Sequence, residues 1–325
     1  MNAHFPENRK LKVAVLMGGT SSERPVSLAT GKMILASLNP DKYEATGIDI
    51  PDLFALTPDN PNRPDVVFIA LHGKGGEDGT VQGMLEILGL PYTGSGVLAS
   101  ALCMNKFLTK RLLSNASMAT ARCVIVNREN LANATPKSLW HPSHGEENLT
   151  DYPVFVKPNA EGSSFGGAKV ETPDALIPAI ENALKYDDAV LIEEYLQGKE
   201  ITVGIIENEA GAPMVSPVVE IVPKSKFYDY ESKYASGGSE HIIPARLPDR
   251  MTQRAQTIAL DCHTILGCRG MSRTDMIVDG EKIYVLEVNT IPGMTPTSLL
   301  PDAAAHAGIP FAELLDRIIA SALRH

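Results

Sequence analysis

The sequence predicts an α/β protein, because buried strands alternate with glycine turns and helices along its N-terminal part. Residues 12–17 form an apolar run that fits a buried strand, and a Gly18–Gly19 turn and a helix follow it. Residues 66–71 form a second apolar run, followed by a glycine-rich turn and a short helix that ends near Gly89. This alternation implies a parallel sheet that binds ligands at the carboxyl ends of its strands.

The first helix has both a start signal and an apolar face. Pro25 suits the first helical turn, where the N–H that proline lacks would have no partner inside the helix. Leu28, Ile34, Leu35 and Leu38 supply the apolar face. The helix is therefore expected to pack against the predicted sheet.

Periodicity and turn residues predict the remaining elements. Thr172 and Pro173 are typical of an N-cap and a first helical residue, and Pro178 is expected to bend or delay the helix that runs from them to Tyr186. The other predicted helices span residues 97–113, 251–266 and 311–323, the strands span 153–157, 190–196 and 200–207, and a hairpin spans 273–288. The stretch from the first of these helices to residue 151 is expected to be irregular, and residues 224–238 form a polar stretch that contains glycine.

Composition limits both the size of the fold and the class of partner. A chain of 325 residues suggests two or three domains, and 44% hydrophobic with 21% charged residues is ordinary globular composition. Acidic residues exceed basic ones, 39 − 29 = 10, which gives the net charge of −10. A chain this acidic is not expected to bind nucleic acid or a membrane surface, so any phosphate must meet a few placed cations.

Neither the apolar segments nor the cysteines suggest a secreted or membrane protein. The longest apolar run, residues 66–71, is far shorter than the ~20 residues that span a bilayer, and residues 1–10 contain no apolar signal core. A cytoplasmic location is expected. Cys103, Cys123, Cys262 and Cys268 form no C-x-x-C pair, which predicts reduced structural thiols and no zinc site.

Two familiar nucleotide-binding motifs are missing. Gly18–Gly19 has no third glycine at the spacing of G-x-G-x-x-G, so a nicotinamide-dependent dehydrogenase is disfavoured. The sequence also contains no G-x-x-x-x-G-K-[ST], which excludes a Walker-type phosphate loop.

The predicted hairpin carries the most informative polar pattern. Residues i and i+2 share a strand face, so Arg273 pairs with Asp275 on one strand and Glu287 with Asn289 on the other. Asp275 opposes Glu287 if the connection has an odd number of residues, because their numbers have an even sum. A three-residue loop over 278–280, with its glycine left-handed and a bulge, satisfies this condition.

If that loop forms, three oxygen donors and a guanidinium converge on one face. Asp275, Glu287 and Asn289 are hard ligands of the kind that Mg²⁺ takes beside phosphates. The alternative is a solvated strand face with two routine charges. The asparagine two residues after a glutamate, within an apolar strand and directly before residues 290–294, favours the metal site.

A second segment is suited to phosphate. Lys157 ends a predicted strand and leads into residues 158–167, a loop rich in glycine and serine. Backbone N–H groups and hydroxyls of such a loop can surround phosphate oxygens, with the lysine as a point charge. Such loops are often no more than turns, so the argument depends on the metal hairpin nearby.

These segments together resemble the ATP-grasp superfamily, and the N-terminal elements narrow the resemblance to the D-alanine–D-alanine ligase family. The matching segments occur in family order and cover nearly the whole chain: residues 17–24, 71–80, 91–96, 157–167, 191–200, 227–234, 273–289 and 287–295. Residues 127–150 fit the family loosely, and Glu194 adds a negative charge beside the proposed adenine segment.

The resemblance implies an ATP-grasp fold of three α/β subdomains. Their expected bounds are 1–94 for a Rossmann-like substrate domain, 95–196 for a central subdomain and 197–325 for a C-terminal subdomain. ATP is expected between the central and C-terminal subdomains. Residues 161–167 and 224–238 are expected to be the loops that close over it and exclude water.

The implied reaction joins two D-alanines with ATP through a D-alanyl phosphate, for peptidoglycan precursor synthesis. By resemblance Lys106, Lys157 and Lys233 meet the phosphates. Glu193 and the backbone at Tyr195 and Leu196 take adenine, and Glu200 takes the ribose hydroxyls. Asp275, Glu287 and Asn289 hold Mg²⁺ or Mn²⁺, with two ions expected and Glu287 bridging them.

The resemblance also assigns the two amino-acid sites. Glu23 would hold the first ammonium group, with His72 near the carboxyl group of the same D-alanine. Arg273 and the N–H of Gly293 match the oxyanion site. Ser298 and Leu299 match the positions that hold the second carboxylate.

Two further positions bear on the acceptor. Ser163 and Tyr234 match residues that bond to each other and to the counterpart of Glu23, and relatives that make D-alanyl-D-lactate often lack this tyrosine. Tyr234 therefore favours the dipeptide ligase over the alternative, a D-alanyl-D-lactate or D-alanyl-D-serine ligase. An inactive nucleotide-binding regulator is disfavoured, since no metal ligand or phosphate lysine is missing. A homodimer is the family habit.

Overall fold

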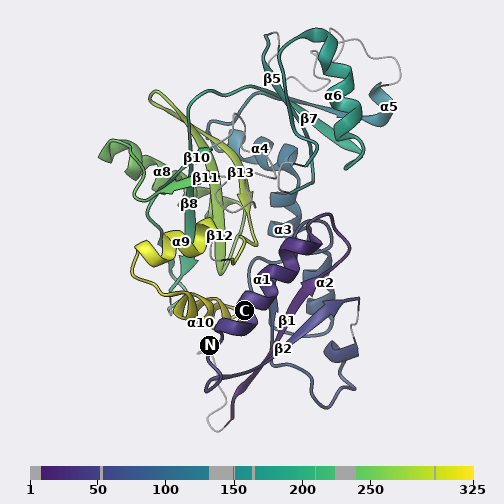
Figure 1. Cartoon of the computed structure of the whole chain (residues 1–325), viewed down its shortest axis with the longest axis vertical. Coiled ribbons are helices and arrows are strands. Elements are labelled where there is room, and N and C mark those ends of the chain that lie inside the picture. The colour runs from purple at the N-terminus through teal and green to yellow at the C-terminus, as the bar shows by residue number, and fades with distance from the viewer. Residues whose placement is uncertain are drawn as a thin grey trace.

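The computed structural model describes residues 9–51, 54–131, 149, 151–162, 165–208, 210–223, 239–295 and 298–325. These residues form a mixed α/β structure, as predicted, with strands in three separate sheets (Figure 1). The predictions for Ser163, Lys233 and Tyr234 lie outside the described residues, as do residues 163–164 of the first expected closing loop and the whole of the second, 224–238.

The N-terminal sheet is parallel and has the strand order β2-β1-β3. Its strands are β1 (Leu11–Gly18), β2 (Tyr43–Ile50) and β3 (Val66–Ile69), joined by α1 (Arg24–Ser37) and the short η1 (Phe54–Leu56), and followed by α2 (Thr80–Ile87). This confirms the parallel sheet. The strand β2 is not predicted, because its side chains alternate poorly between buried and exposed.

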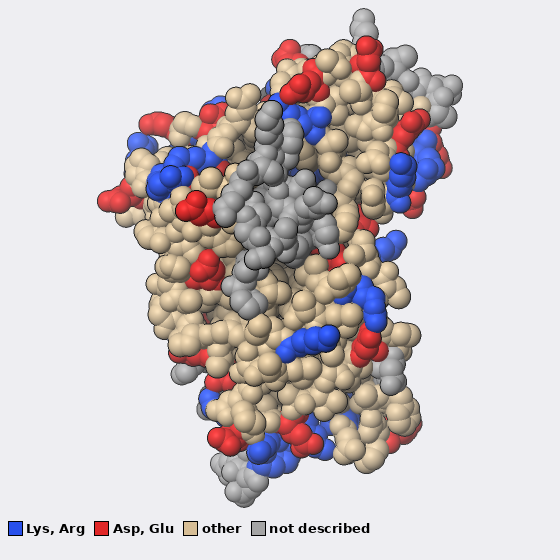
Figure 2. Space-filling model, viewed as in Figure 1, with Lys and Arg blue, Asp and Glu red and all other residues tan. Residues whose placement is uncertain are grey.

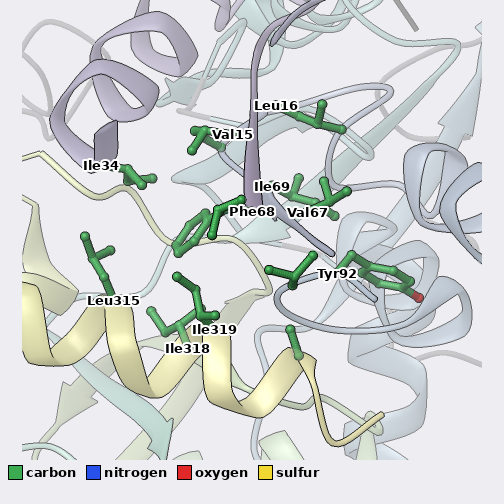
Figure 3. Close-up of a cluster of buried hydrophobic side chains, with 14 of the residues drawn as sticks. Val15, Leu16, Ile34, Val67, Phe68, Ile69, Tyr92, Leu315, Ile318 and Ile319 are labelled. Carbon is green, nitrogen blue, oxygen red and sulfur yellow. The ribbon is translucent and has the colours of Figure 1, made fainter. Parts of the chain in front are cut away.

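The C-terminal helix completes the core of this N-terminal sheet. Helix α10 (Phe311–Ala322) places Leu315, Ile318 and Ile319 against Phe68 and its neighbours, all of them buried (Figure 3). Since α10 also contacts α1 and β3, the two ends of the chain share one hydrophobic core. The domain boundaries given above remain a proposal. Helix α10 falls within the proposed C-terminal subdomain by sequence, but it packs in the core of the proposed N-terminal domain.

The second sheet is antiparallel, with four strands in the order β4-β7-β5-β6. The strands are β4 (Cys123–Asn127), β5 (Val154–Pro158), β6 (Ala168–Val170) and β7 (Ala189–Glu194), accompanied by α5 (Arg128–Leu131), η3 (Pro173–Ala175) and α6 (Leu176–Ala183). The strand β4 lies in a segment expected to be irregular, so that expectation is wrong there. Leu176 and Ile180 bury the predicted apolar face of α6.

The third sheet has the order β11-β10-β8-β12-β13, with β9 paired to β8. Its strands are β8 (Lys199–Glu207), β9 (Pro213–Val215), β10 (Val219–Pro223), β11 (Ser239–Ile242), β12 (Met271–Asp279) and β13 (Lys282–Asn289). Helices α8 (Asp249–Ile265) and α9 (Leu299–His306) both contact β8. The helix and hairpin predicted here are confirmed.

The hairpin reaches its predicted pairing by a different route. Asp275 opposes Glu287, as predicted, but Asp279 pairs with Lys282, so the turn contains two residues and not three. A shift in register between Asp275 and Met276 restores the pairing, because Glu287 pairs with Asp275 while Val285 pairs with Met276. A β-bulge in β13 therefore supplies the odd residue that the loop was expected to supply.

The predicted helix over 97–113 is two helices, α3 (Val97–Met104) and α4 (Lys106–Asn115). Asn105 separates them with extended backbone, and its side chain caps α4 by accepting from the N–H of Leu108. Asn159 accepts from two more N–H groups of α4, through its backbone oxygen from Lys106 and through its side chain from Phe107. These tertiary partners satisfy a helix start that the apolar pattern does not reveal.

The described surface carries charges of both signs (Figure 2). On the face in Figure 2, acidic and basic side chains alternate without a large patch of one sign. Among the described residues, no helix is both long and apolar enough to cross a membrane. The four cysteines, all within the described residues, form no disulfide, and the sulfur atoms of Cys103 and Cys268 lie 3.9 Å apart.

Candidate functional site

A cavity of about 970 Å³ opens between the four-stranded sheet and the six-stranded sheet. Clefts of roughly 300–1,000 Å³ hold drug-sized ligands, so the volume suits a nucleotide. The predicted residues that line it are Lys106, Lys157, Glu193, Tyr195, Leu196, Glu200, Asp275 and Glu287. Segments far apart in sequence thus meet where the nucleotide is expected.

The predicted metal ligands converge on one face of the hairpin. Asp275 opposes Glu287, and Arg273 opposes Asn289. The Arg273 guanidinium donates to both oxygens of Asp275 at 2.9 and 2.8 Å, and Nδ2 of Asn289 lies 3.1 Å from Asp275 Oδ2. Four polar side chains therefore meet at the end of the hairpin nearest the cavity.

This donor set fits a hard divalent cation. Asp275 is buried and also accepts from Thr202 Oγ1 at 2.6 Å, so its carboxylate is held rigidly. No three His, Cys, Asp or Glu side chains form a metal cluster within the described ranges, and the set here is two carboxylates and an amide. Mg²⁺ usually takes one or two carboxylates and completes its shell with phosphate oxygens and water. The residues suit Mg²⁺ or Mn²⁺ bound together with a polyphosphate.

Two lysines project toward the same region. Lys106, the first residue of α4, donates from Nζ to the backbone oxygen of Glu161 at 2.6 Å and lies 3.6 Å from Glu287 Oε2. Lys157 Nζ on β5 lies 2.9 Å from Glu193 Oε2. Burial alone would lower the pKa of Lys157, but the charges of Glu193 and Glu287 outweigh burial and raise it. Lys157 therefore stays protonated and able to meet phosphate.

Glu193, at the end of β7, is buried between two ammonium groups. Its Oε1 lies 3.0 Å from Lys110 Nζ and its Oε2 lies 2.9 Å from Lys157 Nζ. Burial alone would raise the pKa of Glu193, yet the two lysines outweigh it and lower the pKa. The neighbouring Glu194 is paired with Arg122 at 2.8 Å, so its negative charge is neutralised.

The predicted ribose and base positions lie along one edge of the cavity. Tyr195 and Leu196 directly follow β7, and Glu200 lies on β8, where it opposes Ile221 and Ile277. Tyr195 also holds Lys169 over its ring, with Nζ 4.7 Å from the ring centre. This edge offers backbone groups, an aromatic ring and a carboxylate within one continuous wall.

A second predicted group forms where the parallel strands end. Glu23 immediately precedes α1 and is buried, and its carboxylate occupies the space that a side chain at Gly73 or Gly162 would need. Glu23 therefore touches the start of the glycine-rich loop, directly before Ser163. This contact joins the N-terminal sheet to the central one.

His72 follows β3 and is buried beside the same group. Its Nε2 lies 3.2 Å from Thr30 Oγ1 and its Nδ1 lies 3.8 Å from Glu77 Oε1. Burial alone would lower the pKa of His72, but Glu77 and, to a smaller extent, Glu23 outweigh it and raise the pKa. The raised pKa favours a protonated ring, which suits an anionic group.

The last predicted residues lie between β13 and α9. Ser298 immediately precedes Leu299, the first residue of α9, and its Oγ accepts from the N–H of Thr295 at 3.0 Å. The side chain of Ser298 also packs closely against Gly293, where an added Cβ would lie 2.9 Å from the hydroxyl. Gly293 therefore cannot carry a side chain without moving Ser298.

Sequence reasoning missed several residues that support this site. Lys110 pairs with Glu193, Thr202 donates to Asp275, and Asn159 accepts from the start of α4. Lys110 had a signal in the sequence, since it lies four residues after Lys106 and therefore on the same face of the helix. Thr202 and Asn159 had none, because their partners are remote in sequence.

Two family models match the chain. The model described as the D-Ala–D-Ala ligase N-terminus matches residues 53–95, and the one described as its C-terminus matches residues 112–320. Together they include nearly every residue of the candidate site, apart from Glu23, Lys106 and Lys110. The matches include β3 of the N-terminal sheet and every strand of the other two sheets.

Individual relatives are similar over nearly their full length. A D-alanine–D-alanine ligase from Syntrophobacter fumaroxidans is 46% identical over 320 residues, covering 97% of this chain and 98% of the relative. The Bacillus anthracis D-alanine–D-alanine ligase solved with ATP is 34% identical, with a TM-score of 0.79 and coverage of 97% and 98%. A D-Ala:D-Ser ligase from Enterococcus faecalis is 31% identical, with a TM-score of 0.79 and coverage of 97% and 100%.

The likeness to these solved structures extends through all three sheets, which confirms the ATP-grasp fold expected from the sequence. Since both family models match and the relatives align across almost the whole chain, the protein belongs to the D-alanine–D-alanine ligase family.

Proposed function

We propose that this protein ligates two D-alanines to D-alanyl-D-alanine, with ATP as the energy source, for peptidoglycan precursor synthesis. The observation that carries this proposal is the cavity between the two antiparallel sheets. It joins two lysines, Lys106 and Lys157, with two carboxylates, Asp275 and Glu287, as polyphosphate with a divalent cation requires.

In the first step the carboxylate of one D-alanine attacks the γ-phosphorus, and the bond to the ADP oxygen breaks. The chain's task is to position the groups in line and neutralise charge. Lys106, Lys157 and Lys233 would hold the phosphates, while Glu23 would hold the D-alanine ammonium group and His72 its carboxyl group. Asp275, Glu287 and Asn289 would hold Mg²⁺, which draws electron density from the phosphate oxygens when bound.

In the second step the amine of the other D-alanine attacks the acyl carbon of the D-alanyl phosphate. The new C–N bond replaces the C–O bond to phosphate, and the amine loses a proton. Arg273 and the N–H of Gly293 would stabilise the oxyanion, while Ser298 and Leu299 would hold the second carboxylate. Ser163 and Tyr234 would bond to each other and to Glu23, and the contact of Glu23 with Gly162 supports this part of the proposal.

The acceptor is D-alanine and not D-lactate or D-serine. The relative that is 46% identical is a D-alanine–D-alanine ligase, whereas the D-Ala:D-Ser ligase is 31% identical. The presence of Tyr234 also favours D-alanine as the acceptor.

The test is ADP release from ATP and Mg²⁺ with D-alanine, with L-alanine, and with D-alanine plus D-lactate in parallel reactions. The proposal expects release with D-alanine alone and D-alanyl-D-alanine as the product. Release that requires D-lactate would overturn the acceptor, and no release in any reaction would overturn the ligase assignment.

We also propose that the protein acts in the cytoplasm, where ATP is abundant, and that it forms a homodimer. Ile87 on α2 and Leu98 on α3 are 89% and 72% exposed, and the two helices contact each other, which supports an apolar contact surface. Light scattering during size-exclusion chromatography should give twice the monomer mass, and Ile87→Lys with Leu98→Lys should give the monomer. A monomeric wild type would contradict the homodimer.

A further inference from the structure

A buried cluster of three charges lies at the base of the cavity. Glu193 is 3% exposed and Lys110 is 2% exposed, and the ion pairs of Glu193 with Lys110 and Lys157 measure 3.0 and 2.9 Å. The register explains why Lys157 reaches Glu193: Phe155 on β5 opposes Glu193 directly, and Lys157 lies diagonally from it on the same face. Lys110 approaches from α4.

The two lysines occupy different positions relative to the cavity. Glu193 and Lys157 line the cavity, but Lys110 does not. Lys110 therefore lies behind Glu193, on the side that faces away from the cavity. Lys110 Nζ and Glu193 Oε1 make no well-directed hydrogen bond with any other part of the chain that the structure describes.

Ligand binding would remove one of the two partners of Glu193. On the proposed function Lys157 turns to the phosphates, which leaves Lys110 as the cation held on Glu193. Titratable side chains near this group include Cys123 on β4, which opposes Glu193, and Glu287 on β13, whose charge acts on Lys157. Another cation, Lys106, lies one helical turn before Lys110 but is held by the backbone oxygen of Glu161 and by Glu287. Lys110 is therefore the cation that remains on Glu193.

We propose that Lys110 is a positioning residue that determines base specificity by holding Glu193 as a carboxylate. The inference rests on the proposed function, in which Glu193 takes adenine. A carboxylate accepts hydrogen bonds and cannot donate, so it pairs with the 6-amino group of adenine and leaves the 6-oxo group of inosine or guanine facing another acceptor. A protonated Glu193 would donate to that 6-oxo group and lose the discrimination.

The test measures the affinity for ATP and ITP by calorimetry, without D-alanine and therefore without turnover. The preference for ATP is the dissociation constant of ITP divided by that of ATP, and we expect Lys110→Met to lower this ratio at least ~10-fold. The decrease should be larger at pH 6 than at pH 8, because a shift of one pKa unit changes the ionised fraction up to tenfold. Part of the preference for ATP over ITP should remain in the variant, because on the proposed function the backbone near Leu196 also holds the base. An unchanged ratio, or equal weakening of both nucleotides, would overturn the proposal.

A double-variant cycle separates this role from a purely structural one. Glu193→Gln should itself narrow the ratio, because its amide both accepts and donates. Adding Lys110→Met to Glu193→Gln should then leave the ratio unchanged, and a further change would overturn the proposal. The double variant removes both charges of the Lys110–Glu193 pair, and the charge of Glu287 still acts on Lys157, so the cycle decides the question even if Lys110→Met fails to fold.

Two controls complete the experiment. Lys110→Arg should restore the wild-type ratio, and Lys185→Met, at an exposed lysine, should not affect it. If the protein binds ATP but forms no dipeptide, the proposed function fails while the ratio still tests Lys110. If wild type binds neither nucleotide, both proposals fail.

Discussion

The N-terminal core consists almost entirely of apolar side chains, whereas the wall of the cavity carries paired charged ones. Around Phe68, side chains from β1, β3 and α10 pack as an almost wholly apolar cluster (Figure 3). Around Glu193, buried lysines and carboxylates meet in pairs, and the nearby Asp275 is held by Arg273 and Thr202. Apolar packing is non-directional and tolerates rearrangement, whereas a buried charge needs a partner at a fixed distance.

This contrast implies that the core determines stability and the wall determines chemistry. A change in the core should lower the free energy of unfolding and spare activity in the molecules that remain folded. A change in the wall should lower activity and leave the free energy of unfolding nearly unchanged. Three substitutions test that division, from the largest expected effect to the smallest, and a fourth measures what a charge pair at the rim of the cavity contributes to stability.

The largest effect is expected in the wall, at Glu287. Glu287→Gln should lower Mg²⁺-dependent turnover at least ~10³-fold, about 4 kcal/mol of activation free energy, because an amide neutralises far less cation charge than a carboxylate. The melting temperature should stay near that of wild type. Glu281→Gln, in the exposed turn of the same hairpin, is the control. Near-normal turnover would remove Glu287 from the metal site.

The core should respond in the opposite way. Phe68→Ala should lower the free energy of unfolding by about 3–4 kcal/mol, through lost burial and the cavity left behind. Urea unfolding measures this, and the specific activity of the folded fraction at low temperature should be unchanged. Phe54→Ala, at a phenylalanine that is 66% exposed, should cost far less. Equal losses at both positions would break the contrast.

Acceptor choice should respond to a single hydroxyl. Tyr234→Phe should leave folding intact and raise the use of D-lactate about tenfold at neutral pH, because it removes one hydrogen bond, worth roughly 1.5 kcal/mol, from the network proposed around Glu23. Product analysis with D-alanine and D-lactate in competition measures the change. Tyr228→Phe is the control within the same segment. An unchanged product ratio would exclude this role for Tyr234.

The smallest effect is expected at the rim of the cavity and depends on pH. The Arg246 guanidinium lowers the pKa of the buried Glu220 to about 2, from an ordinary 4.5. A carboxyl with a lowered pKa stabilises the fold above pH 4.5, and that contribution is lost as the pH falls toward about 2.

Arg246→Met should therefore lower the free energy of unfolding at pH 7 and lower it less at pH 3, as measured by urea unfolding. Lys199 also bonds to Glu220 at 3.2 Å and retains part of the effect. Arg250→Met, at an exposed position in α8, should change stability at neither pH. A loss that is the same at both pH values would show that Arg246 acts through packing and not through charge.

Local patterns were sufficient for much of the fold, whereas most of the proposed site residues came from the family resemblance and remain a proposal. Apolar runs and glycine turns predicted the parallel N-terminal sheet, and the i, i+2 spacing predicted that Arg273 shares a strand face with Asp275 and Glu287 with Asn289. These predictions succeed because side-chain direction in a strand follows sequence number directly. The short or poorly alternating strands β2 and β4 lacked that signal.

The sequence by itself determined which groups are available: oxygen ligands at i and i+2, lysines before glycine-rich turns and an acidic chain that must place its few cations. The tertiary structure alone decided how they meet. A bulge in β13 and not the turn set the hairpin register, Asn159 accepted from the first N–H groups of α4, and Lys110 was placed behind Glu193. Each depends on a partner distant in the chain, and buried polar groups are stable only once such a partner is in place.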